Sequence, residues 1–125
     1  MSHLSILRTK LTDRETLLGA LRDLGYDVDL REGQKIRAND RISEVEFSVT
    51  PAFSASIGFK RGKNGYAIVA DWFLIQLDRK KFSGELAQRY AYLTSIAQLT
   101  QDGFTLVEEK RESDGRIRLT LRRLG

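Results

Sequence analysis

The chain has 125 residues, of which 41% are hydrophobic and 30% are charged, a balance typical of one globular domain and not of a disordered chain. It contains no cysteine, which excludes disulfide frameworks, thiol nucleophiles and thiolate metal sites. Its only histidine, His3, leaves little room for histidine-based metal or acid–base sites. We therefore expect a single domain over residues 1–125 that holds no metal and no cofactor.

The sequence shows no targeting signal and no membrane-spanning segment. Charged residues such as Arg8 and Lys10 prevent an apolar signal-peptide core from forming near the N-terminus. The longest strongly apolar run, residues 67–75, is interrupted by Asp71 and is far shorter than the roughly 20 residues of a membrane helix. We expect a cytoplasmic protein, or a stromal one if it is made in a plastid, that does not enter a membrane.

The first part of the chain predicts a strand followed by a helix. Residues 4–11 are compatible with a strand, although their alternation is imperfect. Thr12 and Glu15 have the spacing of a capping box, in which the threonine oxygen accepts a hydrogen bond from the Glu15 amide. Leucines then recur at helical spacing, and Gly25 is the residue type that ends helices in the left-handed conformation. We therefore expect the first helix between Thr12 and Gly25.

The middle of the chain predicts strands separated by turns. Alternating apolar and polar residues indicate strands over residues 26–30 and 45–49. A further strand starts at Ile57 and turns through the basic segment 60–65, where Asn-Gly favours a hairpin turn. Residues 66–76 are apolar on both faces, so we expect them to form a central strand.

The last third of the chain predicts a long helix and a hairpin. Apolar residues at helical spacing cover residues 81–102, and Gly103 ends the helix. Strands 104–110 and 116–123 flank a turn, and loops of two to four residues all fit it. The element order is therefore β-α-β-β-β-β-α-β-β, an α+β fold with a mainly antiparallel sheet and two helices.

The net charge of +4 is concentrated at the C-terminal end of the chain. Basic and acidic side chains balance over residues 1–109, so the excess lies in residues 110–125. One interpretation is a surface that binds an anionic partner; the other is a charged edge that keeps the strand soluble. In the first interpretation the binding residues would be Arg116, Arg118 and Arg122.

The segment Gln88–Tyr92 is the densest cluster of side chains typical of recognition surfaces. On a helix Arg89 and Tyr92 are neighbours at i, i+3, and Tyr90 turns inward. Arg and Tyr are enriched where proteins bind one another, which makes Arg89 and Tyr92 candidate partner contacts. The alternative is that the tyrosines pack in the core with their hydroxyls in water.

The basic turn offers a second candidate surface. Lys60, Arg61 and Lys63 could contact phosphates, and the nearby Phe59 and Tyr66 could stack on a base. The glycine spacing of this turn does not match a phosphate-binding loop, which also needs a helix after the second glycine. We therefore interpret the turn as a basic hairpin tip and not as a nucleotide-binding loop.

Asp71 is the carboxylate with the most unusual setting, because it lies inside the most apolar segment of the chain. A buried Asp71 could act as a general acid or base, with Arg89 holding an anionic substrate. The alternatives are a structural ion pair with Arg89 or a solvated position at an edge. We assign no catalytic residue.

Seven short segments, distributed in order over nearly the whole chain, carry a family resemblance. They are Met1–Ser5, Leu24–Gly25, Val69–Asp71, Gln88–Tyr92, Gly103–Phe104, Val107–Glu109 and Asp114–Leu119. With them the chain resembles domain-of-unknown-function family 1257, the hypothetical chloroplast reading frame 35 proteins of cyanobacteria, algal plastids and other bacteria. The resemblance implies a small protein without a cofactor, in an accessory role beside an AAA-type ATPase or a small companion domain. The segments 77–81 and 122–124 depart from the family pattern, which implies a relative outside the plastid branch.

Three functional hypotheses follow. The first is a non-enzymatic accessory or adaptor domain that binds a protein partner through Arg89 and Tyr92 and through the C-terminal arginines. The second is a nucleic-acid-binding module that uses the Lys60–Lys63 turn and the basic last strand. The third is an enzyme that depends on Asp71.

Overall fold

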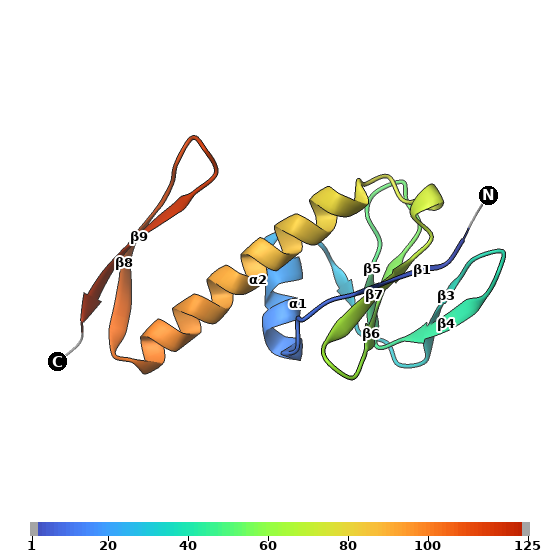
Figure 1. The fold of residues 1–125 in the computed structure, drawn as a ribbon, viewed down its shortest axis with the longest axis horizontal. Coiled ribbons are helices and arrows are strands. Elements are labelled where there is room, and N and C mark those ends of the chain that lie inside the picture. Colours follow the sequence, from blue (N-terminus) through green and yellow to red (C-terminus); the bar gives the residue numbers. More distant parts are fainter. Residues whose placement is uncertain (1–2, 124–125) are drawn as a thin grey trace. The chain divides into compact units, whose positions relative to one another are not determined.

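The computed structural model describes residues 3–123, which form two α-helices, nine strands and one 3-10 helix (Figure 1). All strands pair antiparallel, which confirms the predicted α+β class with two helices. The chain divides into two compact units, residues 1–90 and residues 91–125. The single domain expected over residues 1–125 stays a prediction.

The first unit is built on a five-stranded sheet with the order β1-β7-β6-β5-β2 (Figure 1). All residues of β7 are buried, and β7 pairs with strands on both sides, which confirms that the chain from residue 66 forms an interior strand. The rings of Phe47 and Phe59 stack on one face of the sheet, with centroids 5.2 Å apart. The strands are β1 Ser5–Arg8, β2 Val28–Asp29, β5 Phe47–Val49, β6 Ile57–Arg61 and β7 Tyr66–Ala70.

Helix α1, Arg14–Asp23, starts one residue later than a Thr12 cap would place it. The N-cap is Asp13, whose carboxylate accepts hydrogen bonds from the Thr16 amide at 2.9 Å and the Thr16 hydroxyl at 2.6 Å. These bonds hold the pKa of Asp13 below its usual value. The predicted capping box was therefore wrong: a carboxylate next to the helix matches the positive end of its dipole, and it caps the helix instead.

The end of α1 follows the prediction. Gly25 has φ of +92°, the left-handed conformation that glycine adopts without a steric penalty. The amide of Tyr26 donates to the Leu21 carbonyl and the Gly25 amide donates to the Arg22 carbonyl, both at 3.0 Å. This pair of bonds is a Schellman motif, which satisfies the last carbonyls of the helix.

A hairpin of β3, Gln34–Arg37, and β4, Ile42–Val45, was not predicted. The residues expected to form one strand over 45–49 belong to two strands in different sheets, because the chain leaves one sheet and enters the other at Glu46. Alternation of apolar and polar residues continues through this crossing, so the sequence pattern gives no sign of it. The strand β3 was missed because Ile36 is its only apolar residue.

Strand β7 is shorter than the strand predicted over residues 66–76. It ends at Ala70, and a 3-10 helix, η1, follows at Trp72–Leu74. Asp71 caps η1, since its Oδ1 accepts a hydrogen bond from the Phe73 amide at 3.2 Å. An aspartate that bonds to the backbone two residues later favours a turn over a continued strand.

Helix α2, Arg79–Gln101, lies within two residues of the predicted boundaries, and Gly103 follows it with φ of +89°. Its buried residues in the described part of the chain are Phe82 and Leu86. The ring of Phe82 packs against Tyr26 at 5.6 Å and Trp72 at 6.0 Å between centroids. Because few of its side chains are buried, α2 needs other contacts to fix its position in the first unit.

The second unit consists of the last part of α2 and the predicted C-terminal hairpin. Its strands are β8, Phe104–Arg111, and β9, Ile117–Arg123. They pair antiparallel, with a bulge between Leu106 and Glu108 that leaves Val107 as the extra residue. The sequence could not fix this register, and the bulge is one reason.

The β3–β4 hairpin lies against β6 at Gly58, which makes this glycine a test of the fold. A β-carbon on Gly58 would lie 2.5 Å from Cγ1 of Val45 and 2.7 Å from Cγ1 of Ile36. Gly58→Ala should therefore lower the free energy of unfolding by about 1–3 kcal/mol, the usual cost of overpacking, in urea unfolding followed by circular dichroism. The control is Gly84→Ala in α2, where the new methyl group meets no neighbour within 4 Å. It should raise the free energy of unfolding by about 0.5–1 kcal/mol. A fully stable Gly58→Ala protein would contradict the packing of this hairpin on β6.

Candidate protein-binding surface

Two consecutive residues of α2 hold the two ends of α1. The hydroxyl oxygen of Tyr90 accepts hydrogen bonds from the amides of Asp13 at 2.9 Å and Thr12 at 3.2 Å, at the start of α1. The guanidinium of Arg89 pairs with Asp23, the last residue of α1, with 2.9 Å between Nε and Oδ2. The predicted inward direction of Tyr90 is thereby confirmed. Arg89 joins two helices of the first unit.

Tyr92 makes the corresponding contact inside the second unit. Its hydroxyl donates to Oε2 of Glu109 on β8 at 2.7 Å, which links α2 to the hairpin. The two residues predicted as partner contacts, Arg89 and Tyr92, are therefore both engaged inside the protein. Their direct contact with a partner stays a prediction, and their structural role is to position α2 and the hairpin.

The second unit has no buried side chain anywhere in its described part, residues 91–123. Leu106 and Val107 are 38% and 56% exposed, respectively. A two-stranded hairpin is only marginally stable in water unless its apolar face packs against something else. The large aliphatic residues that remain at least partly accessible are Leu93, Ile96, Leu99, Leu106, Val107, Ile117, Leu119 and Leu121.

The register of the hairpin separates its side chains into two faces. On one face Leu106 pairs with Leu121, Leu119 lies opposite Glu109 and Ile117 lies opposite Arg111, so apolar residues of β9 share this face with charged residues of β8. The opposite face, which we call the basic face, contains Thr105, Glu108, Lys110, Arg118, Thr120 and Arg122. On this face Lys110 lies directly opposite Arg118. Two like charges in that position destabilise a strand pair, so an anion bound there would relieve a repulsion.

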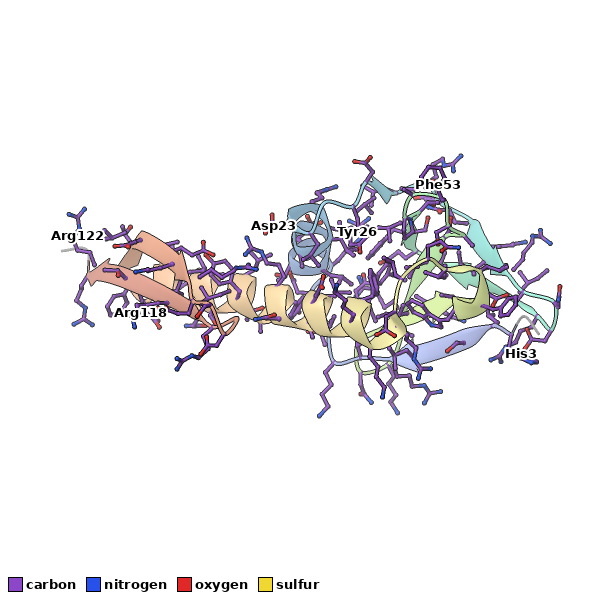
Figure 2. The ribbon with its side chains drawn as sticks, turned by 90° about the horizontal axis from the view of Figure 1, so that it is seen from above. His3, Asp23, Tyr26, Phe53, Arg118 and Arg122 are labelled. Carbon is purple, nitrogen blue, oxygen red and sulfur yellow. The ribbon has the colours of Figure 1, made fainter. Side chains whose placement is uncertain are left out.

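The arginines of the hairpin are held only loosely. Arg118 pairs with Glu112, with 3.2 Å between Nε and Oε1, and its side chain is 70% exposed. Arg116, in the turn just before β9, pairs with Asp114 at 2.6 Å and is 81% exposed. Exposed ion pairs of this kind contribute less than about 1 kcal/mol, so a partner can replace them at little cost. Figure 2 shows Arg118 and Arg122 on the hairpin.

The structure therefore brings Arg118 and Arg122 onto one face, together with Lys110, which the sequence analysis did not select. Lys110 lies next to Arg111 in the sequence, and only the strand register shows which of the two shares a face with Arg118. A register with a bulge at Val107 places Lys110 opposite Arg118, and the sequence pattern alone does not indicate this bulge. Arg116 lies outside the paired strand.

The basic turn between β6 and β7 lacks the stacking surface that a nucleic-acid site needs. Phe59 and Tyr66 are 0% and 1% exposed, so the prediction that they stack on a base was wrong. Arg61 is engaged inside the protein, since it donates to the Tyr66 hydroxyl and lies 3.5 Å from Glu46. Lys60 and Lys63 are exposed, and their contact with nucleic acid stays a prediction.

Tyr66 is the centre of a charged cluster that joins α1 to the sheet. Its hydroxyl donates to Glu46, which also lies 3.7 Å from Nε of Arg14. The guanidinium of Arg14 covers the ring of Phe47, 5.8 Å from its centroid. Burial, and then the neighbouring Glu46 carboxylate, raise the pKa of Tyr66 to about 12. We interpret this cluster as structural, because every member contacts another.

Asp71 is buried, at 2% exposure, and its Oδ1 caps η1. Its Oδ2 has no hydrogen-bond partner among residues 3–123, and neither does Nε1 of Trp72. The predicted alternative of an ion pair with Arg89 is not formed, because Arg89 pairs with Asp23. Asp71 therefore acts in the structure as the cap of η1.

One polar hollow of about 450 Å³ lies beside β2, β3 and β5. The side chain of Gln34, which lines this hollow, already has hydrogen-bond partners inside the protein. Its amide nitrogen donates to the carbonyls of Asp29 and Arg31, and its amide oxygen accepts from the Ser48 hydroxyl at 2.6 Å. Among residues 3–123 no group of three His, Asp or Glu side chains could hold a metal ion. The described helices include none that is both long and apolar enough to cross a membrane.

Comparison with known proteins places this chain among uncharacterised relatives. The model of a family described as "Protein of unknown function (DUF1257)" matches residues 20–120. The chain is 29% identical over 126 residues to "Uncharacterized protein ycf35" of Pyropia yezoensis and 30% identical over 125 residues to the protein of the same name from Guillardia theta. Each comparison covers 98% of both chains. No solved structure matches the chain.

The contact between Tyr90 and the start of α1 predicts a measurable stability loss. Tyr90→Phe keeps the ring but removes the acceptor for two backbone amides, so the free energy of unfolding should fall by about 1 kcal/mol in urea unfolding. Tyr26→Phe is the control, because the Tyr26 hydroxyl makes no hydrogen bond within residues 3–123. An equal effect of the two substitutions would contradict this role of Tyr90.

The raised pKa of Tyr66 predicts a loss of stability at alkaline pH. The ordinary pKa is 10.0 and the folded value is about 12, so between these values the folded state keeps a proton that the unfolded state has released. The stabilisation is complete below pH 10 and is lost as the pH rises through 12, by an amount on the order of 2 kcal/mol. An absorbance titration at alkaline pH should show one of the four tyrosines ionising near pH 12. That step should be missing in Tyr66→Phe; its persistence there would assign it to another residue.

Proposed function

Since the chain belongs to the DUF1257 family, whose description states no function, we propose from its own surface that it is a non-enzymatic accessory or adaptor protein. In this proposal it binds another protein through residues 91–123. The observation that carries the proposal is that no described side chain in this unit is buried, although it contains eight large aliphatic residues. Apolar surface of this kind is typical of protein interfaces that form a core only in the complex.

The chemistry of the surface indicates what kind of partner would fit. Leu106 and Val107 offer exposed apolar side chains that a partner can cover, and Arg118 and Arg122 lie on the face opposite to that of Leu106. A partner with an apolar groove and an acidic rim would match both features, because its carboxylates could pair with Lys110 and Arg118. An AAA-type ATPase or a small companion domain in the cytoplasm is the partner class that the family resemblance implies.

Arg89 and Tyr92 take a supporting part in this proposal. Arg89 fixes α2 to α1, and Tyr92 fixes the hairpin to α2 through Glu109. Substituting them would disturb the position of the binding surface as well as any direct contact. They are therefore positioning residues, and variants on the hairpin itself give a cleaner test.

A second candidate function, nucleic-acid binding, is favoured by one observation. Lys110 and Arg118 lie opposite each other with Arg122 on the same face, and phosphate groups would neutralise all three. Against it, Glu108 lies on the same face, and Phe59 and Tyr66 beside the basic turn are buried. On the hairpin the ring of Phe104 is only partly exposed and is already covered by the guanidinium of Arg123, 5.3 Å from its centroid. We therefore favour the protein partner.

Charge and shape variants of the hairpin test the proposed function. Val107→Asp places a charge on the exposed apolar residue, and Lys110→Glu with Arg118→Glu reverses the basic face. Each should weaken binding of a purified partner at least tenfold, since each removes one of the two proposed interface elements. The control Lys60→Glu with Lys63→Glu makes the same charge change as the double hairpin variant, but on the first unit, and should leave the affinity unchanged.

The partner is first obtained by a tagged pull-down from the native host at moderate salt, with and without nuclease. Its affinity for the wild-type chain and the variants is then measured by titration. Binding that survives nuclease and responds only to the hairpin variants supports the proposal. Retention that disappears with nuclease, together with oligonucleotide affinity that falls steeply between low and high salt, would instead establish the nucleic-acid function.

A further inference from the structure

The loop between β5 and β6 exposes a phenylalanine in an unfavourable backbone conformation. Phe53 is 99% exposed, and its φ is +58°, the left-handed region that residues other than glycine rarely adopt. Figure 2 shows this side chain on the outside of the first unit. Both the exposed ring and the left-handed backbone are costly for the isolated chain, and neither serves the core. Such a combination is typical of a residue retained for an interaction.

Phe53 belongs to a larger apolar patch formed by two segments. Phe73 and Leu74 of η1 are 73% and 46% exposed. The two segments are tied together, because the Ala55 amide donates to the Leu74 carbonyl at 3.2 Å and the Gln76 amide donates to Oγ of Ser54 at 3.0 Å. We call Phe53, Phe73 and Leu74 the Phe53 patch. These two hydrogen bonds hold the loop next to η1, so the three side chains belong to one surface.

A shallow hollow of about 630 Å³ lies in the same surface. It is lined by residues 50–55 of the loop and by Leu74 of η1. The patch therefore contains both a projecting ring and a depression beside it. Two such surfaces related by a two-fold axis can each receive the ring of the other, which is the arrangement of an isologous interface.

The charge of these segments favours a second copy of the chain as the occupant. Residues 47–59 and 72–77 contain no Lys, Arg, Asp or Glu. A two-fold axis brings every residue of a patch close to its own copy, so a charged patch would repel itself. In a chain with 30% charged residues and a net charge of +4, this uncharged surface allows two copies to approach without that repulsion.

From these observations we propose that the Phe53 patch joins two copies of the chain, with the ring of each Phe53 in the hollow of the other. The proposal is independent of the partner surface on residues 91–123. Aromatic side chains bury roughly 150–250 Å² each, whereas a standard interface buries about 800 Å² per partner. The dimer is therefore weak, with a dissociation constant on the order of micromolar to hundreds of micromolar.

Sedimentation velocity over protein concentrations from about 5 to about 500 μM tests the proposal. The wild-type chain should shift from monomer to dimer over this range. Because the interface is uncharged, the dissociation constant should change by less than about twofold between low and high salt. A wild-type chain that stays monomeric throughout would overturn the proposal and leave the patch to a different protein.

Phe53→Gly separates the interface from the fold. Glycine adopts φ of +58° without the steric penalty, so the variant should unfold at a higher urea concentration than the wild type while its dimer is lost. The control is Ile42→Ser, which removes another exposed apolar side chain, 53% accessible, from β4 and should leave the dimer intact. A dimer that persists in Phe53→Gly, or that is lost equally in Ile42→Ser, would overturn the proposal.

Discussion

The contacts of Arg89 and Tyr90 with the two ends of α1 are the constraint on which the first unit's helices depend. Helix α2 buries only Phe82 and Leu86 among its described residues, so apolar packing alone does not fix its direction. Tyr90 binds the amides at the start of α1, and Arg89 pairs with Asp23 at its end. These polar bonds are directional, and they set the position of α2 along α1 in a way that two buried side chains could not.

The same helix continues into a unit of a different character. In the first unit an interior strand is buried along its whole length and charged residues such as Arg61 and Glu46 bond to one another. In residues 91–123 every described side chain remains accessible, and the links are polar, as between Tyr92 and Glu109. The first unit thus has a hydrophobic core, whereas the apolar residues of the described part of the second unit are not buried in one. This contrast is the physical basis for proposing that the segment is completed by another protein.

The sequence predicted the elements whose signals are local. The end of α1 at Gly25, the extent of α2 and the alternation of Ile117, Leu119 and Leu121 in β9 all follow from spacing and from glycine chemistry, and the structure has them. The capping box at Thr12 was wrong because two adjacent residues could both cap the helix and the carboxylate of Asp13 does so. Choosing between them requires knowing that the Thr12 amide bonds to Tyr90, a residue 78 positions away.

The rest depended on contacts that no local pattern encodes. The crossing of the chain from one sheet to another at Glu46 leaves the alternation intact, and the β3–β4 hairpin is recognised only by its packing on Gly58. The candidate site shows the same limit. Arg89 and Tyr92 were predicted as partner contacts, and this stays a prediction; their contacts with Asp23 and Glu109 inside the protein were not predicted. Lys110 became a candidate only through the strand register.

Hydrogen exchange of the isolated chain tests the central claim most directly, because it measures how firmly each segment's backbone bonds are held. We expect amides of β8 and β9 to exchange at least about a hundredfold faster than those of β6 and β7, since the described hairpin residues have no buried side chain. Equal protection of the hairpin and the central strands would contradict it, because residues 91–123 would then be complete without a partner.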